Sequence, residues 1–305
     1  MRDLPPFGNL INAGGKCMKQ PYIWPASIQA AFCFTIDVDA ESPQLWRSRN
    51  QSSLSMNELE QRCYGLREGI WHLLEILKRH DVRATCFVPA HEAETRPWLL
   101  ETLADAGHEI GLHGVLHEVV SDLSPDQFSE IVEKGIETVV RMTGLRPLGF
   151  RSPSWEMTPW AFDVLRRAGI LYDSSLSGYD HPYSLGQTIE IPIQWTLDDA
   201  VFFRYAGTGA DRWAPRTTSE TAGSWLEICA GIERFGGSVV TTVHPWLTGR
   251  SGRIPLAEAL LEHARNTDGL WVCTTGELAA YHARSSNSDR FRESATLPDR
   301  SSPLD

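Results

Sequence analysis

The chain of 305 residues predicts an α/β fold, a single barrel of seven or eight mainly parallel strands. Short apolar runs alternate with amphipathic helical patterns, which is typical of parallel βα units. No linker divides the sequence into two halves, so a closed or nearly closed barrel is favoured over a doubly wound sheet. Ionisable residues follow several apolar runs, and a barrel gathers its chemistry at the carboxyl ends of its strands.

The first half of the sequence contains the clearest elements. Residues 30–38 are rich in Phe, Ile, Val and Cys, and they predict a buried strand. An irregular polar loop over residues 42–55 follows, and then an amphipathic helix from about residue 57 to residue 80. A second strand is expected over residues 82–88. Gly107 is expected at the C-cap of a helix that begins near residue 96.

One further helix has a strong start signal. Ser124 is a cap residue, Pro125 occupies the first helical position and Gln127 completes a capping box. The remaining predicted strands cover residues 109–112, 148–150, 170–172, 189–193, 238–243 and 269–273.

We expect three segments. Residues 1–28 form an N-terminal arm, residues 29–283 form the barrel, and residues 284–305 form a polar tail without periodicity that is expected to be disordered. The arm is expected to pack against a second subunit, which predicts a homo-oligomer.

Composition restricts the partners and the compartment. The net charge of −11 argues against nucleic acids and anionic membranes. The N-terminal residues lack the apolar region of a signal peptide, and no apolar run approaches the length of a transmembrane helix. The six cysteines show no CxxC spacing, so we expect reduced thiols and a cytoplasmic protein.

Two carboxylates appear where the first strand ends. Asp37 and Asp39 are two residues apart, so their side chains project to the same side. Paired negative charges are costly without a cation or an arginine nearby. His113, Arg151 and His244 follow other predicted strands, and barrel topology would bring them to the same end.

The spacing of His113 and His117 indicates a metal site. At i and i+4 on a helical turn, two imidazoles share one face, although such a pair alone is often structural. Joined to Asp39, the pair becomes a set of three ligands with room for water, which is typical of a catalytic divalent ion. Zn²⁺ is the default, and Co²⁺, Ni²⁺ or Mn²⁺ would accept the same donors.

The sequence resembles the polysaccharide deacetylase superfamily, carbohydrate esterase family 4, over about residues 30–280. The motifs that carry the resemblance are TIDVDAES, HGVLHE, FRSPSW, YDSSL and TVHPW. The closest resemblance is to a branch with cytosolic peptidoglycan-deacetylase-like proteins, cyclic imide hydrolases and metal-independent allantoinases. Membership would imply a distorted (β/α) barrel with seven or eight strands.

The resemblance also implies roles for individual residues. His244 resembles the general acid, and Asp173, Asp198 or Asp199 is expected to tune it. Trp155 resembles a wall of the substrate cleft, and we expect Glu41 and Arg250 to contact the substrate. The other implied roles are catalytic base for Asp37, partner of that base for Arg151, and metal ligand for Asp39, His113 and His117.

The predicted function is a metal-dependent hydrolase of an amide C–N bond other than a peptide bond. The preferred reaction is deacetylation of an N-acetylated sugar or small molecule, and the expected partner is a small-molecule or oligosaccharide amide substrate. Secreted members of the family carry adjacent aspartates followed by Gly, whereas here Val38 separates Asp37 from Asp39 and Ala40 follows, which disfavours a polymeric glycan substrate. Ring opening of a cyclic imide, hydantoin or ureide is therefore the alternative. An inactive binding relative and a metal-dependent sugar isomerase or aldolase are more distant hypotheses.

Overall fold

A computed structural model describes residues 22–52, 54–207, 211 and 213–286. Within these residues, one sheet contains nine strands in the order β6–β7–β5–β4–β3–β2–β1–β8, and β9 pairs with the start of β1. All of these pairs are parallel except the antiparallel pair β6–β7. The strands are β1 (Ala30–Asp37), β2 (Thr85–Val88), β3 (Glu109–Leu112), β4 (Gly149–Phe150), β5 (Tyr172–Asp173), β6 (Tyr183–Leu185), β7 (Thr188–Glu190), β8 (Ser238–Val243) and β9 (Leu270–Val272).

The sheet curls on itself, and the segment that follows β7 spans the remaining gap. In that segment, Asp198 forms a parallel bridge with Thr242 of β8. The N–H of Asp199 also donates to the carbonyl oxygen of Thr242 at 3.0 Å. The prediction of a distorted barrel of mainly parallel strands is therefore confirmed, and the β6–β7 hairpin is an addition to it.

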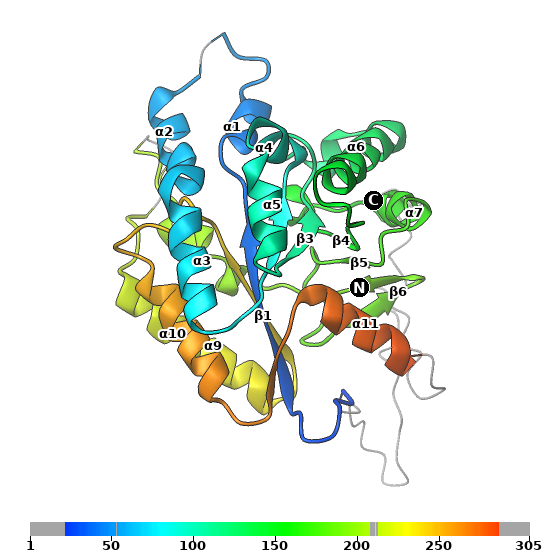
Figure 1. The fold of residues 1–305 in the computed structure, drawn as a ribbon, viewed down its shortest axis with the longest axis vertical. Coiled ribbons are helices and arrows are strands. Elements are labelled where there is room, and N and C mark those ends of the chain that lie inside the picture. Colours follow the sequence, from blue (N-terminus) through cyan, green and yellow to red (C-terminus); the bar gives the residue numbers. More distant parts are fainter. Residues whose placement is uncertain (1–21, 53, 208–210, 212, 287–305) are drawn as a thin grey trace, which may run out of the picture.

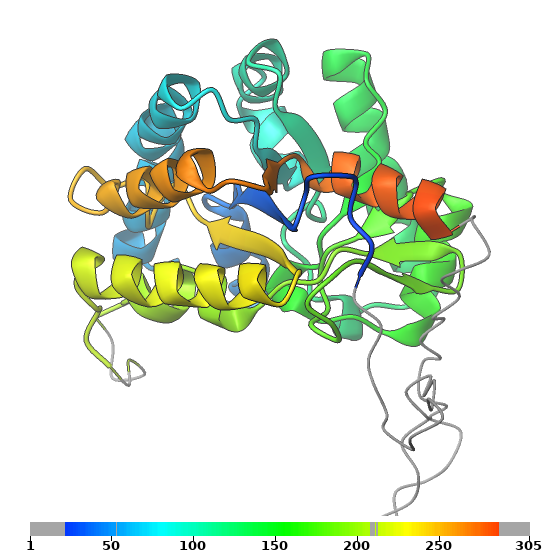
Figure 2. The ribbon, with the colours of Figure 1, turned by 90° about the horizontal axis from the view of Figure 1, so that it is seen from below.

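Helices surround the curled sheet, as the two perpendicular views show (Figures 1 and 2). The longest, α6, begins with the predicted capping box at Ser124, and Gly107 adopts the expected left-handed conformation with φ of 77°. The α-helices are α1 (Ser42–Arg47), α2 (Met56–Tyr64), α3 (Ile70–Arg79), α4 (Ala90–Thr95), α5 (Trp98–Asp105), α6 (Pro125–Thr143), α7 (Pro159–Arg167), α8 (Ala200–Phe203), α9 (Thr218–Arg234), α10 (Pro255–Asn266) and α11 (Thr275–Ser286).

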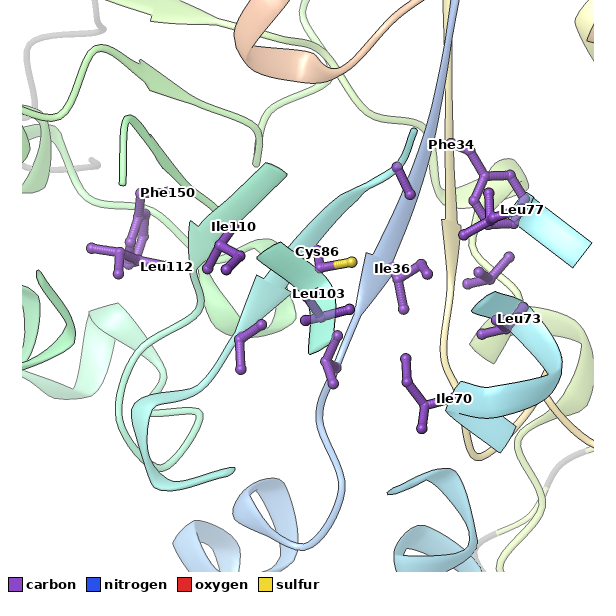
Figure 3. Packing of buried hydrophobic residues seen from close by; sticks show 14 of the residues in the cluster. Phe34, Ile36, Ile70, Leu73, Leu77, Cys86, Leu103, Ile110, Leu112 and Phe150 are labelled. Atoms are coloured by element: carbon purple, nitrogen blue, oxygen red, sulfur yellow. The ribbon is translucent and has the colours of Figure 1, made fainter. Parts of the chain in front are cut away.

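Alternation along β1 separates an outer core from an inner one. Phe34 and Ile36 belong to the outer cluster, where they pack with Leu73 of α3 (Figure 3). Cys33 belongs to a second, inner cluster, which also contains Leu278 and Ala279 of α11. Because successive side chains of a strand point to opposite faces, Asp37 falls on the inner side with Cys33.

The long helix predicted near residues 57–80 consists of α2, a π-helical turn and α3. The π turn allows a very close approach to the segment after β8. A Cβ on Gly65 would lie 2.9 Å from the backbone nitrogen of Trp246, and a Cβ on Gly69 would overlap the carbonyl oxygen of Pro245. Since π turns are frequent at functional sites, this contact suggests that the end of β8 belongs to such a site.

Two predicted boundaries differ from the structure. Residues 42–47 form α1, where a loop was expected, with Pro43 in the first turn of the helix. At the other end, α11 extends to Ser286, so the predicted tail begins as helix. Of the predicted arm, Tyr22 packs on α11, with its Oη 3.0 Å from Nδ1 of His282.

Residues 1–21 of the arm and residues 287–305 of the tail lie outside the described residues. In the described part of the chain, no helix combines the length and apolar character that crossing a bilayer requires.

Candidate active site

Asp37 faces a buried guanidinium inside the barrel. Arg151, directly after β4, is 0% exposed, and its Nη1 lies 2.7 Å from Oδ1 of Asp37. The same Nη1 lies 2.7 Å from Oγ1 of Thr35, while Nε and Nη2 donate to Ser174 at 3.0 Å. Because a guanidinium holds its donors in a fixed plane, these bonds fix both Arg151 and the carboxylate of Asp37.

The environment of Asp37 favours its ionised form. Burial alone would raise the pKa of Asp37, but the charge of Arg151, with its hydrogen bond to the carboxylate, leads the effects that outweigh burial and lower it. While Arg151 holds Oδ1, Oδ2 lies 3.8 Å from Nε2 of His113. Asp37 therefore presents one oxygen, as a carboxylate, to the neighbouring histidine.

His113 and His117 lie on a loop and not on the helical turn that their spacing predicted. Gly114 and His117 both adopt left-handed conformations, with φ of 74° and 61°. The carboxylate of Glu118 accepts hydrogen bonds from the N–H groups of Val115 at 2.8 Å and Leu116 at 2.9 Å. This turn brings the two imidazole rings edge to face, with 4.9 Å between their centroids.

Asp39, His113 and His117 present one carboxylate and two imidazoles to the same space. Nδ1 of His113 donates to the carbonyl oxygen of Arg151 at 2.8 Å, so its Nε2 has a free lone pair. Nε2 of His117 lies 4.0 Å from Oδ2 of Asp39. Among the described residues, no donor reaches the buried Oδ1 of Asp39. The imidazole nitrogen that lies near this oxygen is Nε2 of His244, at 3.5 Å. The ligand atoms of Asp39, His113 and His117 are not all within 4.8 Å of one another, so the case for a divalent cation here is their donor chemistry, one carboxylate and two imidazoles.

Arg62 is a buried cation at this site that the sequence analysis did not include. It is 5% exposed, and its Nη1 lies 3.3 Å from Oδ2 of Asp39. Its guanidinium carbon lies 4.6 Å from the centre of the Trp246 ring. Burial lowers the pKa of Arg62 to about 10, so the side chain stays charged at neutral pH. Arg62 therefore balances the charge of one oxygen of Asp39.

Among the three aspartates considered as partners of His244, Asp199 holds the imidazole. Its Oδ1 lies 2.6 Å from Nδ1 of His244, and its Oδ2 accepts the backbone N–H of His244 at 2.9 Å. The hydroxyl of Thr248 donates to the same Oδ2 at 2.5 Å. Nε2 of His244 is left facing the site, 3.5 Å from Oδ1 of Asp39.

Three donors lie close together in this part of the site. The ligand atoms of Asp198, Asp199 and His244 are within 4.8 Å of one another, a spacing that could hold an ion. However, both oxygens of Asp199 already accept N–H or O–H donors. We therefore interpret the cluster as hydrogen-bonded support for His244.

The charges around His244 favour its protonated form. Burial alone would lower the pKa of His244, but Asp39 and Asp199 outweigh burial and raise it well above its usual value. Asp198 is buried as well, and burial raises the pKa of its carboxyl to about 7.

Asp173 does not contact His244. Its Oδ1 accepts the hydroxyl of Ser175 at 2.9 Å, and burial raises its pKa to about 6. Its neighbour is Glu190, whose pKa is raised well above its usual value by burial and by Asp173. This pair of carboxyl groups lies behind Arg151 and supports the strand ends.

A cavity of about 260 Å³ is lined by Asp37, Asp39, His113, His117 and His244. Aromatic rings form part of its wall, and Trp155 and Trp195 lie 4.2 Å apart between ring centroids. Trp155, predicted as a wall of the substrate cleft, lines this cavity. The other tryptophans and the arginines of the lining are Trp46, Trp246, Arg47, Arg62 and Arg204.

The two other predicted substrate contacts do not line this cavity. Both oxygens of Glu41 accept Nη2 of Arg96, at 2.7 and 2.9 Å. Arg250 donates from Nε to the carbonyl oxygen of Trp246 at 3.1 Å, and its guanidinium lies 4.3 Å from the centre of the Tyr64 ring. Each side chain is occupied by an internal contact.

Comparisons with known proteins place the chain in a family. The polysaccharide deacetylase family matches residues 63–172, which include His113, His117 and Arg151. The peptidoglycan deacetylase of Helicobacter pylori is 25% identical over 276 residues, which cover 81% of this chain and 94% of that protein.

Solved structures extend the likeness to nearly the whole chain. The structure of PuuE allantoinase has a TM-score of 0.76 at 20% identity, and the match covers 92% of this chain and 98% of the other. A Mycobacterium smegmatis protein assigned to the polysaccharide deacetylases is 32% identical, with a TM-score of 0.84. That match covers 92% of this chain and 98% of the other. The chain therefore belongs to the polysaccharide deacetylase family, carbohydrate esterase family 4.

Proposed function

We propose that the protein is a metal-dependent hydrolase of an amide C–N bond other than a peptide bond. The observation that carries this proposal is that one cavity is lined by a carboxylate whose environment favours the ionised form and by an imidazole whose environment favours the protonated form. Asp37 is held ionised by Arg151, and His244 is held protonated by Asp199. Two groups whose environments favour opposite protonation states suit a base and an acid.

Asp37 is the proposed base. Its Oδ1 is fixed by Arg151, so Oδ2 is the atom that takes the proton from an attacking water. The lowered pKa of Asp37 keeps the carboxylate ionised before the reaction. Because the hydrogen bonds of the buried Arg151 already orient Asp37, little reorganisation is needed for Asp37 to accept the proton.

Asp39, His113 and His117 would hold the divalent ion, which we propose to be Zn²⁺, with Co²⁺, Ni²⁺ or Mn²⁺ as other candidates. When bound, such an ion supplies Lewis-acid polarisation of the amide carbonyl and acidifies water. The hydrogen bond from His113 to the carbonyl of Arg151 orients that ligand. Arg62 would limit the negative charge on Asp39.

His244 is the proposed acid. Its Nδ1 is held by Asp199, so Nε2 is the atom that donates a proton to the leaving nitrogen. An amine leaves only as the protonated group, which makes this proton transfer necessary for C–N cleavage. The raised pKa of His244 keeps that proton in place at neutral pH.

The preferred substrate is an N-acetylated sugar or a related small amide. The Helicobacter pylori relative is a peptidoglycan deacetylase by name, and the Mycobacterium smegmatis structure carries the same family assignment. A cavity of about 260 Å³ lies near the lower limit for ligand pockets and suits one ring and its acyl group. Trp155 and Trp195 offer faces against which a ring can pack.

Opening of a cyclic imide, hydantoin or ureide is the alternative. The fold shared with PuuE allantoinase supports it, and the same base, acid and cavity would serve a ring amide. A metal-dependent isomerase or aldolase has no support in these likenesses. A cytoplasmic location and a homo-oligomer remain predictions.

Mass spectrometry of products tests the proposal with protein prepared with and without added zinc. The panel contains N-acetylglucosamine and its oligomers, succinimide, glutarimide, hydantoin and allantoin. Zinc-dependent loss of an acetyl group is the expected result. Gain of one water by a ring compound would select the alternative reaction. If no panel member changes while zinc stays bound, both proposed substrate classes are wrong.

A further inference from the structure

Two arginines on separate segments form a positively charged wall of the cavity. Arg47 lies at the end of α1 and Arg204 lies directly after α8, and both line the cavity beside Arg62. Arg62 is paired with Asp39. Within the described part of the chain, neither Arg47 nor Arg204 forms an ion pair with a carboxylate. We call Arg47 and Arg204 the cationic wall.

The donors of the cationic wall are largely available. Arg47 is anchored by its Nε, which donates to the carbonyl oxygen of Pro43 at 3.2 Å. Its Nη2 donates to Oε1 of Gln44 at 3.1 Å. The other N–H groups of Arg47 and the whole guanidinium of Arg204 make no hydrogen bond to a described residue. A guanidinium has five N–H donors, so both side chains can still bind an acceptor group.

The arginines of this wall repel one another. Besides burial, the charge of Arg204 lowers the pKa of Arg47, and Arg47 and Arg204 both lower the pKa of Arg62. Close like charges cost free energy, part of which an incoming anion would recover. The carboxylates of Glu58 and Asp39 act on the pKa of Arg47 in the opposite direction, but neither forms an ion pair with it.

We propose that the cationic wall binds a carboxylate of the substrate, so that the preferred amide carries an acidic substituent. This inference rests on the proposed function and adds the substrate class. A carboxylate matches the planar fork of arginine better than a neutral hydroxyl does. The small cavity places that acid on the reacting ring or directly beside it. The substrate is then oriented with its amide at Asp37 and His244 and its acid at the wall.

Matched substrate pairs test the inference for both proposed reactions. One pair is N-acetylmuramic acid and N-acetylglucosamine, and the other is hydantoin-5-acetic acid and hydantoin. We expect the acidic member of the reactive pair to have at least a tenfold higher kcat/KM. Arg204→Gln and Arg47→Gln should each remove most of that preference, measured as the ratio of kcat/KM for the acidic and the neutral member. Arg234→Gln, at the end of α9 and at the opposite end of β8, is the matched control and should leave the preference unchanged.

Calorimetric binding of muramic acid and glucosamine separates failure of this inference from failure of the proposed function. Arg204-dependent binding of muramic acid, at least tenfold tighter than glucosamine, supports the wall even if no panel amide is hydrolysed. Equal kcat/KM for both members of a hydrolysed pair overturns the carboxylate inference and leaves the hydrolase intact. Equal binding of the two amines to the wild type and to Arg204→Gln overturns it as well.

Discussion

The floor and the rim of the cavity are built from different kinds of structure. The floor consists of Asp37, Asp39, His113 and His244, which end or follow strands, together with Arg151, which is buried against Asp37 and does not itself line the cavity. The rim consists of Trp46, Arg47, Trp195 and Arg204, which belong to or border short helices.

Burial separates these regions sharply. Arg151 is 0% exposed and Asp37 is 2% exposed, whereas Trp195 in the rim is 52% exposed. Floor residues also contact one another directly, as the 2.7 Å distance between Arg151 and Asp37 shows. In the proposed function, parallel strand ends would fix the groups for proton transfer, while less constrained segments would select the substrate.

The largest expected effect is that of Asp37→Asn in the floor. The amide cannot accept a proton, so kcat should fall by about 10²–10⁴-fold. Removing the charge leaves Arg151 buried without its partner, so the unfolding free energy should fall too, by about 3–5 kcal/mol. Steady-state kinetics, zinc content and thermal unfolding measure the three quantities together. If Asp37→Asn folds, binds zinc fully and keeps an unchanged kcat, Asp37 is not the catalytic base.

Asp199→Asn should have the next largest effect, through His244. The carboxylate raises the pKa of His244, so its loss should lower that pKa. Because His244 must be protonated to donate, the alkaline limb of the kcat/KM profile should move to lower pH. We expect kcat to fall by about 10²-fold at neutral pH.

Asp198→Asn is the matched control for this change. Asp198 lies 3.9 Å from Nδ1 of His244, whereas Asp199 lies at 2.6 Å. Its loss should shift the alkaline limb less than the loss of Asp199 does. Equal shifts in the two variants would show that proximity of charge matters more than the hydrogen bond to Asp199.

In the rim, Trp195→Ala should change binding more than chemistry. Loss of the ring that packs with Trp155 should raise KM by up to about tenfold while kcat stays within twofold. Trp71→Ala is the control, because Trp71 is 45% exposed on α3 and stacks on Trp98 away from the cavity. A large fall in kcat for Trp195→Ala would show that a rim residue also contributes to the chemical step, contrary to the division between floor and rim.

The floor was predictable from the sequence because its residues are tied to strand ends. Asp37 and Asp39 stand beside a long apolar run, and parallel topology brings His113, Arg151 and His244 to the same place. The loop around His113 and His117 was assigned the wrong local structure, since the spacing of four residues suits a helical turn equally well.

The rim and Arg62 were not predictable in the same way. Arg62 lies in an amphipathic helix, where an arginine usually covers a solvated face. It enters the site because Gly65 and Gly69 let the π turn approach the segment after β8. Conversely, Arg250 was expected to contact the substrate, yet its guanidinium packs on Tyr64. Both outcomes depend on long-range packing that no local pattern encodes.

The smallest expected effect on turnover is that of Asp173→Asn, a strand-end residue with a structural role. Because burial raises its pKa to about 6, the folded state binds this proton more tightly than the unfolded state. Its stabilisation is fully present below the unfolded pKa of about 3.9 and is lost as pH rises through about 6. Asp173→Asn should therefore gain stability relative to the wild type between pH 4 and pH 8 in urea unfolding, with kcat within twofold. If the alkaline limb of the kcat/KM profile shifts in this variant, Asp173 influences the pKa of His244, and the residues that act in the reaction would include the end of β5.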